Sequence, residues 1–254
     1  MEKLRNFKLT IEYDGSEFQG WQLQKQCRTV QGDLENALLA IFKKNTRLYG
    51  SGRTDSGVHA KGQVANFKTI TRLTTTELLK AINAHLKKDV VVLQLEETSQ
   101  TFHARYSAKR KTYQYWLLNR TLRSSLIHGH SLHVPYPLNI RRMREASQFF
   151  IGKNDFRSLA SKDPAGGHDQ NEKNTTRTIY RLEIKKKHEH LLIEIEANGF
   201  LYKMVRNIVG LLLEIGKGRL PATAAKTFLE QKNREVLVKK TAPAHGLYLS
   251  KVVY

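Results

Sequence analysis

The spacing of apolar residues switches repeatedly between the period of a strand and that of a helix, and this order limits the folds open to the chain. Apolar residues alternate from Phe7 to Tyr13, which predicts a strand. After Thr29, a residue able to cap a helix, they recur at helical spacing and predict a helix that ends near Lys44. Thr74 and Glu77 have the spacing of a capping box and predict a second helix. Strands are predicted near 46–49, 63–68 and 89–95, so the order is β-α-β-β-α-β, that of a ferredoxin-like unit.

The second half of the chain repeats this order with extra segments. Strands are predicted near 111–118, 178–186, 190–197 and 247–253, and helices near 139–151 and 201–215, with a shorter helix after Pro221. We therefore predict an α+β fold of two ferredoxin-like halves, residues 1–105 and 106–254. The duplication rests on element order and not on residue identity between the halves. Two segments, 120–137 and 161–176, carry few periodic signals and predict loops.

The charge balance indicates a polyanionic partner. Lys and Arg number 43 against 23 Asp and Glu, a formal net charge of +20. Such an excess repels itself in the compact state, and a polyanion neutralises it. Nucleic acid is the leading candidate, because each phosphate contact by Lys or Arg releases a counterion. An anionic membrane surface and a basic surface with no specific partner are the alternatives.

Cysteine usage and hydropathy restrict the class of protein further. The chain has one cysteine, Cys27, which excludes a disulfide framework and a cysteine-rich zinc site. The histidine pairs 128/130 and 188/190 have no third ligand at suitable spacing, so we predict no metal site. The first residues lack the apolar stretch of a signal peptide, and no run is long enough to span a bilayer. We therefore expect a soluble, cytoplasmic protein.

A glycine-rich segment from Gly50 to Ala60 is the strongest candidate for chemistry. Its sequence, Gly-Ser-Gly-Arg-Thr-Asp-Ser-Gly-Val-His-Ala, matches neither a dinucleotide fingerprint nor a P-loop. It places the carboxylate of Asp55 between two strands, with Arg53 two residues before it. A loop of this kind brings a backbone close to a ligand. The residues alone leave a second interpretation open, an Asx turn in which Asp55 bonds its own backbone.

Two further segments carry candidate binding residues. Arg206 lies in an apolar helix, where a cation either snorkels to the surface or pairs with a carboxylate and keeps that group ionised. Tyr113 and Tyr115 share one strand face after a run of basic residues, a pattern that suits a stacked nucleobase, although each could instead be a core residue. For two other carboxylates we predict structural roles. Asp14 should lie in a turn, and Glu214 should pair with a nearby Lys or Arg.

Together, these segments resemble the TruA family of tRNA pseudouridine synthases. The resemblance covers nearly the whole chain. It is carried by blocks at residues 13–15, 20–22, 52–60, 62–64, 102–105, 111–113, 177–179, 200–210 and 242–248. Ser56 is a departure, since the family usually has Ala there. The resemblance implies a pseudouridine synthase fold in which the sheets of two ferredoxin-like halves join across a central basic cleft. It also implies a homodimer that binds the anticodon arm of tRNA and isomerises uridine at positions 38, 39 and 40 without a metal or organic cofactor.

The resemblance also implies roles for individual residues. Asp55 matches the catalytic nucleophile, Tyr113 a substrate-binding tyrosine, Arg206 an active-site cation that pairs with the nucleophile, and Arg53 an arginine that helps to extrude the target nucleotide. Two alternatives stay open at this point. One is a catalytically inactive RNA-binding homologue, and the other is a uridine isomerase with a different RNA target.

Overall fold

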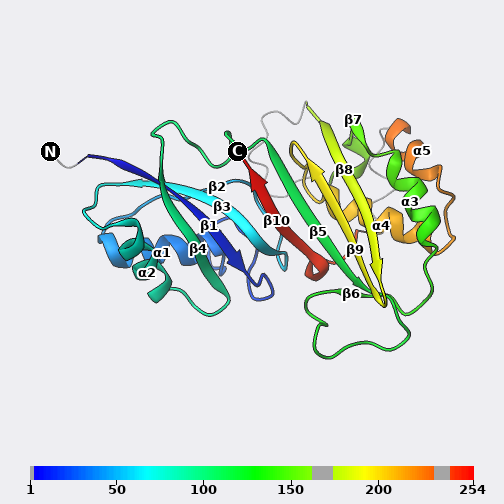
Figure 1. Ribbon diagram of the computed structural model, residues 1–254, viewed down its shortest axis with the longest axis horizontal. Helices are drawn as coiled ribbons and strands as arrows, with labels where there is room; N and C mark the ends of the chain where they lie inside the picture. Colours follow the sequence, from blue (N-terminus) through cyan, green and yellow to red (C-terminus); the bar gives the residue numbers. More distant parts are fainter. Residues whose placement is uncertain (1–2, 162–173, 232–240) are drawn as a thin grey trace. The chain divides into compact units, whose positions relative to one another are not determined.

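The computed structural model describes residues 3–161, 174–231 and 241–254. The chain divides into two compact units (Figure 1). The first comprises Met1–Lys109 with Tyr248–Tyr254, and the second comprises Arg110–Leu247. The division expected from the sequence, between residues 105 and 106, differs from this one in position and in where it places the last strand. That strand belongs to the first unit because it pairs there with another strand of the sheet.

The first unit has the β-α-β-β-α-β order predicted from the sequence. Its elements are β1 (Arg5–Tyr13), α1 (Val30–Phe42), β2 (Tyr49–Gly50), β3 (His59–Thr69), α2 (Thr75–Ala84), β4 (Val90–Thr98) and, from the end of the chain, β10 (Leu247–Val253). Its strands lie in the order β4-β1-β3-β10, and β2 pairs with β3. Strand β1 is antiparallel to both neighbours, whereas β10 is parallel to β3.

Local sequence explains why these elements begin where they do. The Thr29 side chain accepts a hydrogen bond from the Gly32 N–H and caps α1, and Thr74 and Glu77 form the predicted capping box of α2. Along β1, alternate residues are buried, and the ring of Phe7 stacks on that of Phe67 in β3 with centroids 5.5 Å apart. This alternation fixes the register, because a slip of one residue would turn the apolar face outward.

The second unit carries the remaining elements. They are β5 (Arg110–Leu118), β6 (Leu132–His133), α3 (Ile140–Gln148), β7 (Gly152–Asp155), η1 (Arg157–Leu159), β8 (Thr176–Lys187), β9 (His190–Ala197), α4 (Met204–Gly216), α5 (Ala224–Gln231) and η3 (Ala244–Gly246). Its strands lie in the order β5-β9-β8-β7, and β6 pairs with β5. Helix α3 packs on α4, α5 and β8, and so joins these helices to the sheet of this unit. Both units are therefore α+β, as predicted.

Several boundaries differ from the sequence predictions. Strand β3 begins at His59 and not at Gln63, and β2 lies at 49–50 and not at 46–49. Helix α4 begins at Met204 and not near residue 201, because Lys203 has φ of +57°, outside the helical region.

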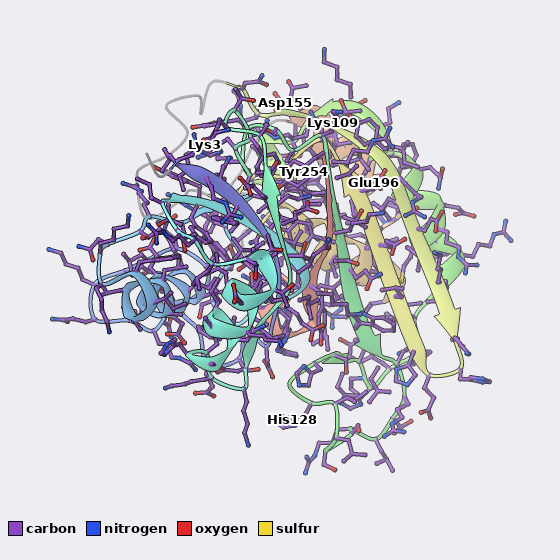
Figure 2. All side chains as sticks on the ribbon, turned by 60° about the vertical axis from the view of Figure 1, so that its left-hand side comes forward. Lys3, Lys109, His128, Asp155, Glu196 and Tyr254 are labelled. Carbon is purple, nitrogen blue, oxygen red and sulfur yellow. The ribbon has the colours of Figure 1, made fainter. Side chains whose placement is uncertain are left out.

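The two predicted loops have different outcomes. The segment 120–137 is mostly irregular but contains β6, and its part around His128 projects from the end of β5 in Figures 1 and 2. Of the second predicted loop, residues 162–173 lie outside the described residues. Within the residues that the structure describes, no helix has the length and apolar character needed to cross a membrane.

Candidate active site

The glycine-rich segment forms the loop between β2 and β3, and buried side chains fix its first residues. Ser51 and Gln63 are both 0% exposed. The Ser51 hydroxyl donates to Oε1 of Gln63 at 2.7 Å, and Nε2 of Gln63 donates to the Gly52 carbonyl at 3.0 Å. Both ends of one amide are thus used to hold the loop. Buried polar groups are tolerated when they are hydrogen-bonded in this way.

The residue before Asp55 is held equally firmly. The hydroxyls of Thr54 and Tyr13 lie 2.8 Å apart in a buried contact, and burial raises the pKa of Tyr13, so that its phenol is neutral and can donate. The backbone N–H of Trp21 donates to the Thr54 carbonyl at 3.1 Å. Both Tyr13 and Trp21 are buried, at 3% and 2% exposed. Thr54 is therefore attached to two different segments of the first unit.

Close backbone approach explains a glycine beside this loop. Gly20 has φ of +84°, and a Cβ at this position would lie 2.5 Å from the Thr54 carbonyl oxygen. Such a contact is far too short, and the φ value is one that residues with side chains rarely adopt. The Gly20-Trp21 segment therefore lies directly against the backbone that carries Asp55.

Asp55 itself lies half-buried at the turn of the loop. The Val58 N–H donates to its backbone carbonyl at 3.2 Å, and Gly57, with φ of +75°, donates its N–H to the Phe18 carbonyl at 3.3 Å. The main chain on both sides of Asp55 is thus hydrogen-bonded. The main chain that carries the Asp55 carboxylate is therefore fixed, which limits where that carboxylate can lie.

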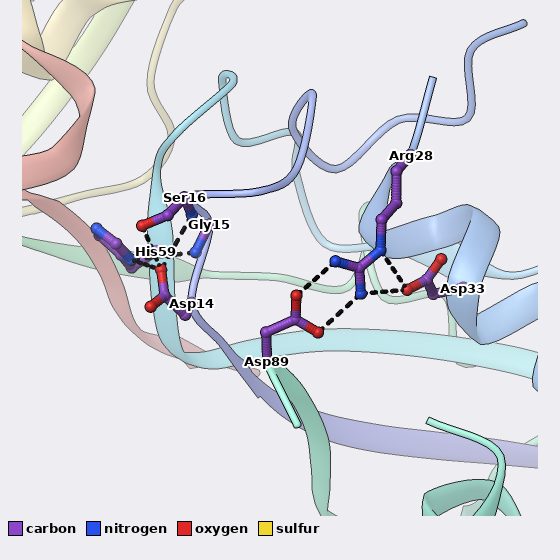
Figure 3. Close-up of polar contacts among 7 residues, drawn as sticks. All are labelled: Asp14, Gly15, Ser16, Arg28, Asp33, His59 and Asp89. Atoms are coloured by element: carbon purple, nitrogen blue, oxygen red, sulfur yellow. Dashed lines mark hydrogen bonds and ion pairs between the residues drawn. The ribbon is translucent and has the colours of Figure 1, made fainter. Parts of the chain in front are cut away.

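The predicted turn at Asp14 is confirmed (Figure 3). Its Oδ1 accepts from the N–H of Ser16 at 3.0 Å and from the Ser16 hydroxyl at 2.6 Å. The same oxygen lies 3.0 Å from Nδ1 of His59, a ring that is 1% exposed and that stacks on Tyr248 with centroids 4.7 Å apart. The start of β3 is thereby joined to the end of β1 and to β10, just beyond the loop.

Figure 3 also shows Arg28, whose ion pairs fix the segment that packs on the Asp55 loop. The Arg28 guanidinium donates to the carboxylates of both Asp33 and Asp89. These bonds lower the pKa of Asp89 despite its partial burial. Cζ of Arg28 also lies 4.2 Å from the centroid of the Phe18 ring. Arg28 therefore links the start of α1 to the start of β4 and covers the residue whose carbonyl binds Gly57.

Arg53 lies on the same loop as Asp55, two residues earlier. Its side chain is half-buried, and Nε donates to Oε1 of Gln22 at 3.2 Å. Gln22 follows Trp21, so the cation is oriented by the same segment that holds Thr54. Arg53 and Asp55 thus lie on one loop of the first unit, and Gln22 orients the Arg53 side chain.

Tyr113 and Tyr115 lie on β5 in the second unit. Tyr115 is a core residue, 0% exposed, and its hydroxyl donates to the Pro243 carbonyl at 2.8 Å. Tyr113 is 8% exposed and meets the ring of Phe200 edge to face, with centroids 5.1 Å apart. Tyr113 is therefore also largely buried, with a small exposed area, whereas Tyr115 has none.

Arg206 lies in the first turn of α4, where it is half-buried. Nε donates to the Ala242 carbonyl at 2.7 Å, and the Ala242 N–H donates to the Arg206 carbonyl at 3.1 Å. Neither of the two expectations from the sequence included this backbone contact. It orients the guanidinium, whose charge also acts on the buried Tyr115.

Glu214 has the structural role predicted from the sequence. It is 4% exposed and pairs with Lys217 at 2.9 Å and with Arg219 at 3.3 Å.

The sequence did not identify the residues that hold the Asp55 loop, namely Tyr13, Trp21 and Gln63. The pattern assigned Tyr13 to the core by alternation alone, and no local signal marks its hydroxyl as a partner of Thr54.

The chain is similar to known proteins over nearly its whole length. A family model described as tRNA pseudouridine synthase matches residues 9–107 and 146–254. The tRNA pseudouridine synthase A of Thermoanaerobacter sp. (strain X514) is 43% identical over 251 residues, which are 99% of this chain and 100% of that protein. The tRNA pseudouridine synthase A of Anoxybacillus flavithermus (strain DSM 21510 / WK1) is 44% identical over 254 residues, 99% of each.

Among solved structures, the archaeal box H/ACA sRNP Nop10-Cbf5 complex is similar at 11% identity and a TM-score of 0.36, over 82% of this chain and 43% of that one. This likeness is too slight to support an argument. In the family comparison, Arg53 and Asp55 lie in the first matched range and Arg206 in the second, whereas Tyr113 lies between the two.

Proposed function

This chain belongs to the family of tRNA pseudouridine synthases, and on that premise we propose that it isomerises uridine at positions 38, 39 and 40 of the tRNA anticodon stem-loop with Asp55 as its nucleophile. The family supplies the reaction and the substrate class. The observation that carries the choice of Asp55 is the fixed backbone on both sides of that residue.

The reaction breaks one bond and forms another at the same carbon. The bond from C1′ of the ribose to N1 of the uracil breaks, the base turns, and a bond from C1′ to C5 forms. The proton on C5 is lost and N1 gains one, so the product is an isomer and no oxidant or reductant is consumed. A carboxylate can take part by attacking C1′, by attacking C6, or by supporting a glycal-type elimination, and in each route it must be ionised.

Access to a paired or stacked nucleotide is the second requirement. The target must leave the helix before a carboxylate can reach it, which costs a few kcal/mol. We propose that Arg53 contacts the phosphates of the extruded nucleotide, since its side chain is held by Gln22 beside the nucleophile. In this role Arg53 lowers the free energy of the extruded state without touching the reacting atoms.

Two residues of the second unit complete the proposal. We propose that Tyr113 contacts the uracil, because it matches the substrate-binding tyrosine of the family and keeps a small exposed area of 8%. We propose that Arg206 binds an anionic group of the substrate, because it matches the active-site cation of the family. The contact of Arg206 with Ala242 supports this role by orienting the guanidinium before substrate arrives.

The protein as a whole is proposed to act as a homodimer in the cytoplasm on the anticodon arm of tRNA. The net charge of +20 supports a polyanionic substrate. Sedimentation of the pure protein tests the dimer. A monomer at working concentration, active on tRNA, would remove the dimer from the proposal without affecting the reaction.

The decisive experiment measures pseudouridine formed in an anticodon-arm RNA by wild-type protein, by Asp55→Ala and by Asp55→Asn. We expect both variants to form no detectable product while they still bind the RNA. Ser56→Ala is the matched control, because it changes the adjacent exposed residue to the one usual in the family, and it should retain activity. An active Asp55→Asn would overturn the assignment, and a wild type that binds RNA without product would favour an inactive homologue.

The target positions need a separate test. Pseudouridines in tRNA are mapped in cells with and without the gene. Loss at positions 38 to 40 supports the proposal, whereas unchanged positions 38 to 40 with loss elsewhere would favour a uridine isomerase with a different RNA target.

A further inference from the structure

Three rings lie in contact on the surface of the first unit, separate from the residues assigned above. The centroids of Tyr49 and His103 are 5.1 Å apart, and those of His103 and Tyr106 are 4.4 Å apart. Tyr49 is 41% exposed and Tyr106 is 76% exposed. We refer to these three residues as the aromatic stack. Rings exposed to this extent offer apolar area that a ligand with a flat face can cover.

Positive charge flanks the aromatic stack. Cζ of Arg47 lies 5.6 Å from the ring centroid of Tyr49, and Cζ of Arg105 lies 5.8 Å from that of Tyr106. Burial, followed by the charges of Arg105 and Lys68, lowers the pKa of His103. Its imidazole is therefore neutral near pH 7 and behaves as a flat aromatic ring. The surface thus alternates flat rings with cations, which is the composition of sites that bind single-stranded nucleic acid.

The turn that carries two of the rings is fixed to the sheet. Residues 99–107 form this turn, and the Asn6 side chain, 0% exposed, donates to two of its carbonyls at 2.8 and 3.0 Å. Oδ1 of Asn66 accepts from the Ala104 N–H at 2.8 Å. The hydroxyl of Tyr254, labelled in Figure 2, donates to the Ala104 carbonyl at 2.8 Å. Buried amides are costly unless they are satisfied, so this turn has one well-defined position.

A hydrogen bond inside the turn orients the central ring. Nδ1 of His103 accepts from the Arg105 N–H at 3.1 Å, and the Ser107 N–H donates to the His103 carbonyl at 2.9 Å. The ring planes of His103 and its neighbours are tilted by 48° and 38°. Because the central ring is oriented before a ligand arrives, binding loses little of the side-chain entropy of His103.

We propose that the aromatic stack binds an unpaired nucleobase of the tRNA substrate, with Arg47 and Arg105 contacting the phosphates on either side. Every base has a π-face, so such a site accepts different sequences. A second copy of this chain is a poorer occupant, because a symmetric contact would bring the same cations against each other. The proposal rests on tRNA being the substrate and is independent of the assignment of Asp55 as nucleophile.

The test measures binding and turnover with a full-length tRNA transcript. Tyr106→Ala should raise Kd roughly five- to hundredfold, the range for loss of one base-aromatic contact. KM should rise in parallel while kcat is retained, because the contact is made equally in the ground and transition states. Tyr106→Phe keeps the ring and should bind like wild type. Arg105→Gln should reduce the slope of log Kd against log salt by about 0.7 to 0.9.

Tyr180→Ala provides the matched control. Tyr180 is also exposed, at 44%, and also lies under an arginine, Arg110, but it belongs to the second unit. Equal weakening by Tyr106→Ala and Tyr180→Ala would overturn the proposal, as would unchanged Kd in Tyr106→Ala. A change of oligomeric state in Tyr106→Ala, seen by sedimentation, would identify the surface as a contact between copies and would also overturn it. Loss of product in Asp55→Ala with unchanged Kd affects neither result.

Discussion

The hydrogen bond between Tyr13 and Thr54 joins the end of β1 to the residue before Asp55, and it can be tested by a double-mutant cycle. Tyr13→Phe and Thr54→Val each remove one hydroxyl with little change in shape. The contact is 2.8 Å long and buried, with Tyr13 at 3% and Thr54 at 6% exposed. Each single variant leaves the other hydroxyl buried without this partner, which costs about 1–3 kcal/mol of the free energy of unfolding.

The double variant has a different expected result. Removing both hydroxyls leaves neither group unsatisfied, so its loss should be close to that of one single variant or smaller. The two single losses together are about 2–6 kcal/mol, and the double variant should lose only about 0–2 kcal/mol. The coupling energy should therefore exceed the roughly 0.5 kcal/mol within which independent sites add. Urea unfolding followed by fluorescence gives the three values.

Turnover supplies the second readout. If the contact positions Asp55, each single variant should form pseudouridine more slowly, by up to about a hundredfold, since a displacement near 1 Å has an effect of that size. The Kd for tRNA should not change. Additive losses of stability, or single variants with wild-type turnover, would refute the argument that this contact holds the loop.

Two further predictions concern the same unit. Gly20→Ala would place a Cβ 2.5 Å from the Thr54 carbonyl oxygen at a φ of +84°. Thermal unfolding should therefore occur at a lower temperature, and turnover should fall. A variant with the melting temperature and turnover of the wild type would contradict the close approach. Asp89 has a lowered pKa because of Arg28, and its contribution to stability is complete above the ordinary value of 3.8 and is lost as pH falls through the lower folded value. Asp89→Asn should therefore be less stable than wild type at pH 7 and should lose less stability below about pH 4, and a parallel decline in both proteins would rule out this linkage.

The parts of the fold that could be predicted are those that neighbouring residues determine. Thr29 and the pair Thr74 and Glu77 act within one helical turn, so the starts of α1 and α2 are visible in the sequence. By contrast, β7 begins at Gly152, which has φ of +94°, and its Gly-Lys-Asn-Asp sequence has no strand pattern. It is a strand because it pairs with β8, and that partner lies far along the chain.

Gly62 shows how a contact with a distant strand can make a predicted strand boundary wrong. The strand expected from the sequence began at Gln63, directly after Gly62. In the fold a Cβ at Gly62 would lie 2.7 Å from the Ser250 carbonyl of β10, so glycine is required there within a continuous strand. The strand accordingly begins at His59, and its neighbour β10 comes from the opposite end of the chain.

The site divides in the same way between local and distant causes. Asp55 and Arg53 became candidates because their loop has a recognisable composition and matches a block of the family that the sequence resembles. The contact of Tyr13 with Thr54 joins residues 41 apart, and that of Arg206 with Ala242 joins residues 36 apart. No local pattern specifies such pairs, so the sequence suggested candidate site residues but not the contacts that hold them.

The hydrogen bonds that hold the Asp55 loop explain why buried polar residues lie in it and beside it. Ser51, Thr54 and Gln63 are each at most 6% exposed, and each bonds to another side chain or to the loop backbone. Packing such a loop with apolar side chains would leave its carbonyl groups without partners, at about 1–3 kcal/mol for each. Because each partner is needed by a different part of the loop, a partial rearrangement loses bonds without replacing them. These bonds therefore favour one conformation of the loop backbone that carries Asp55.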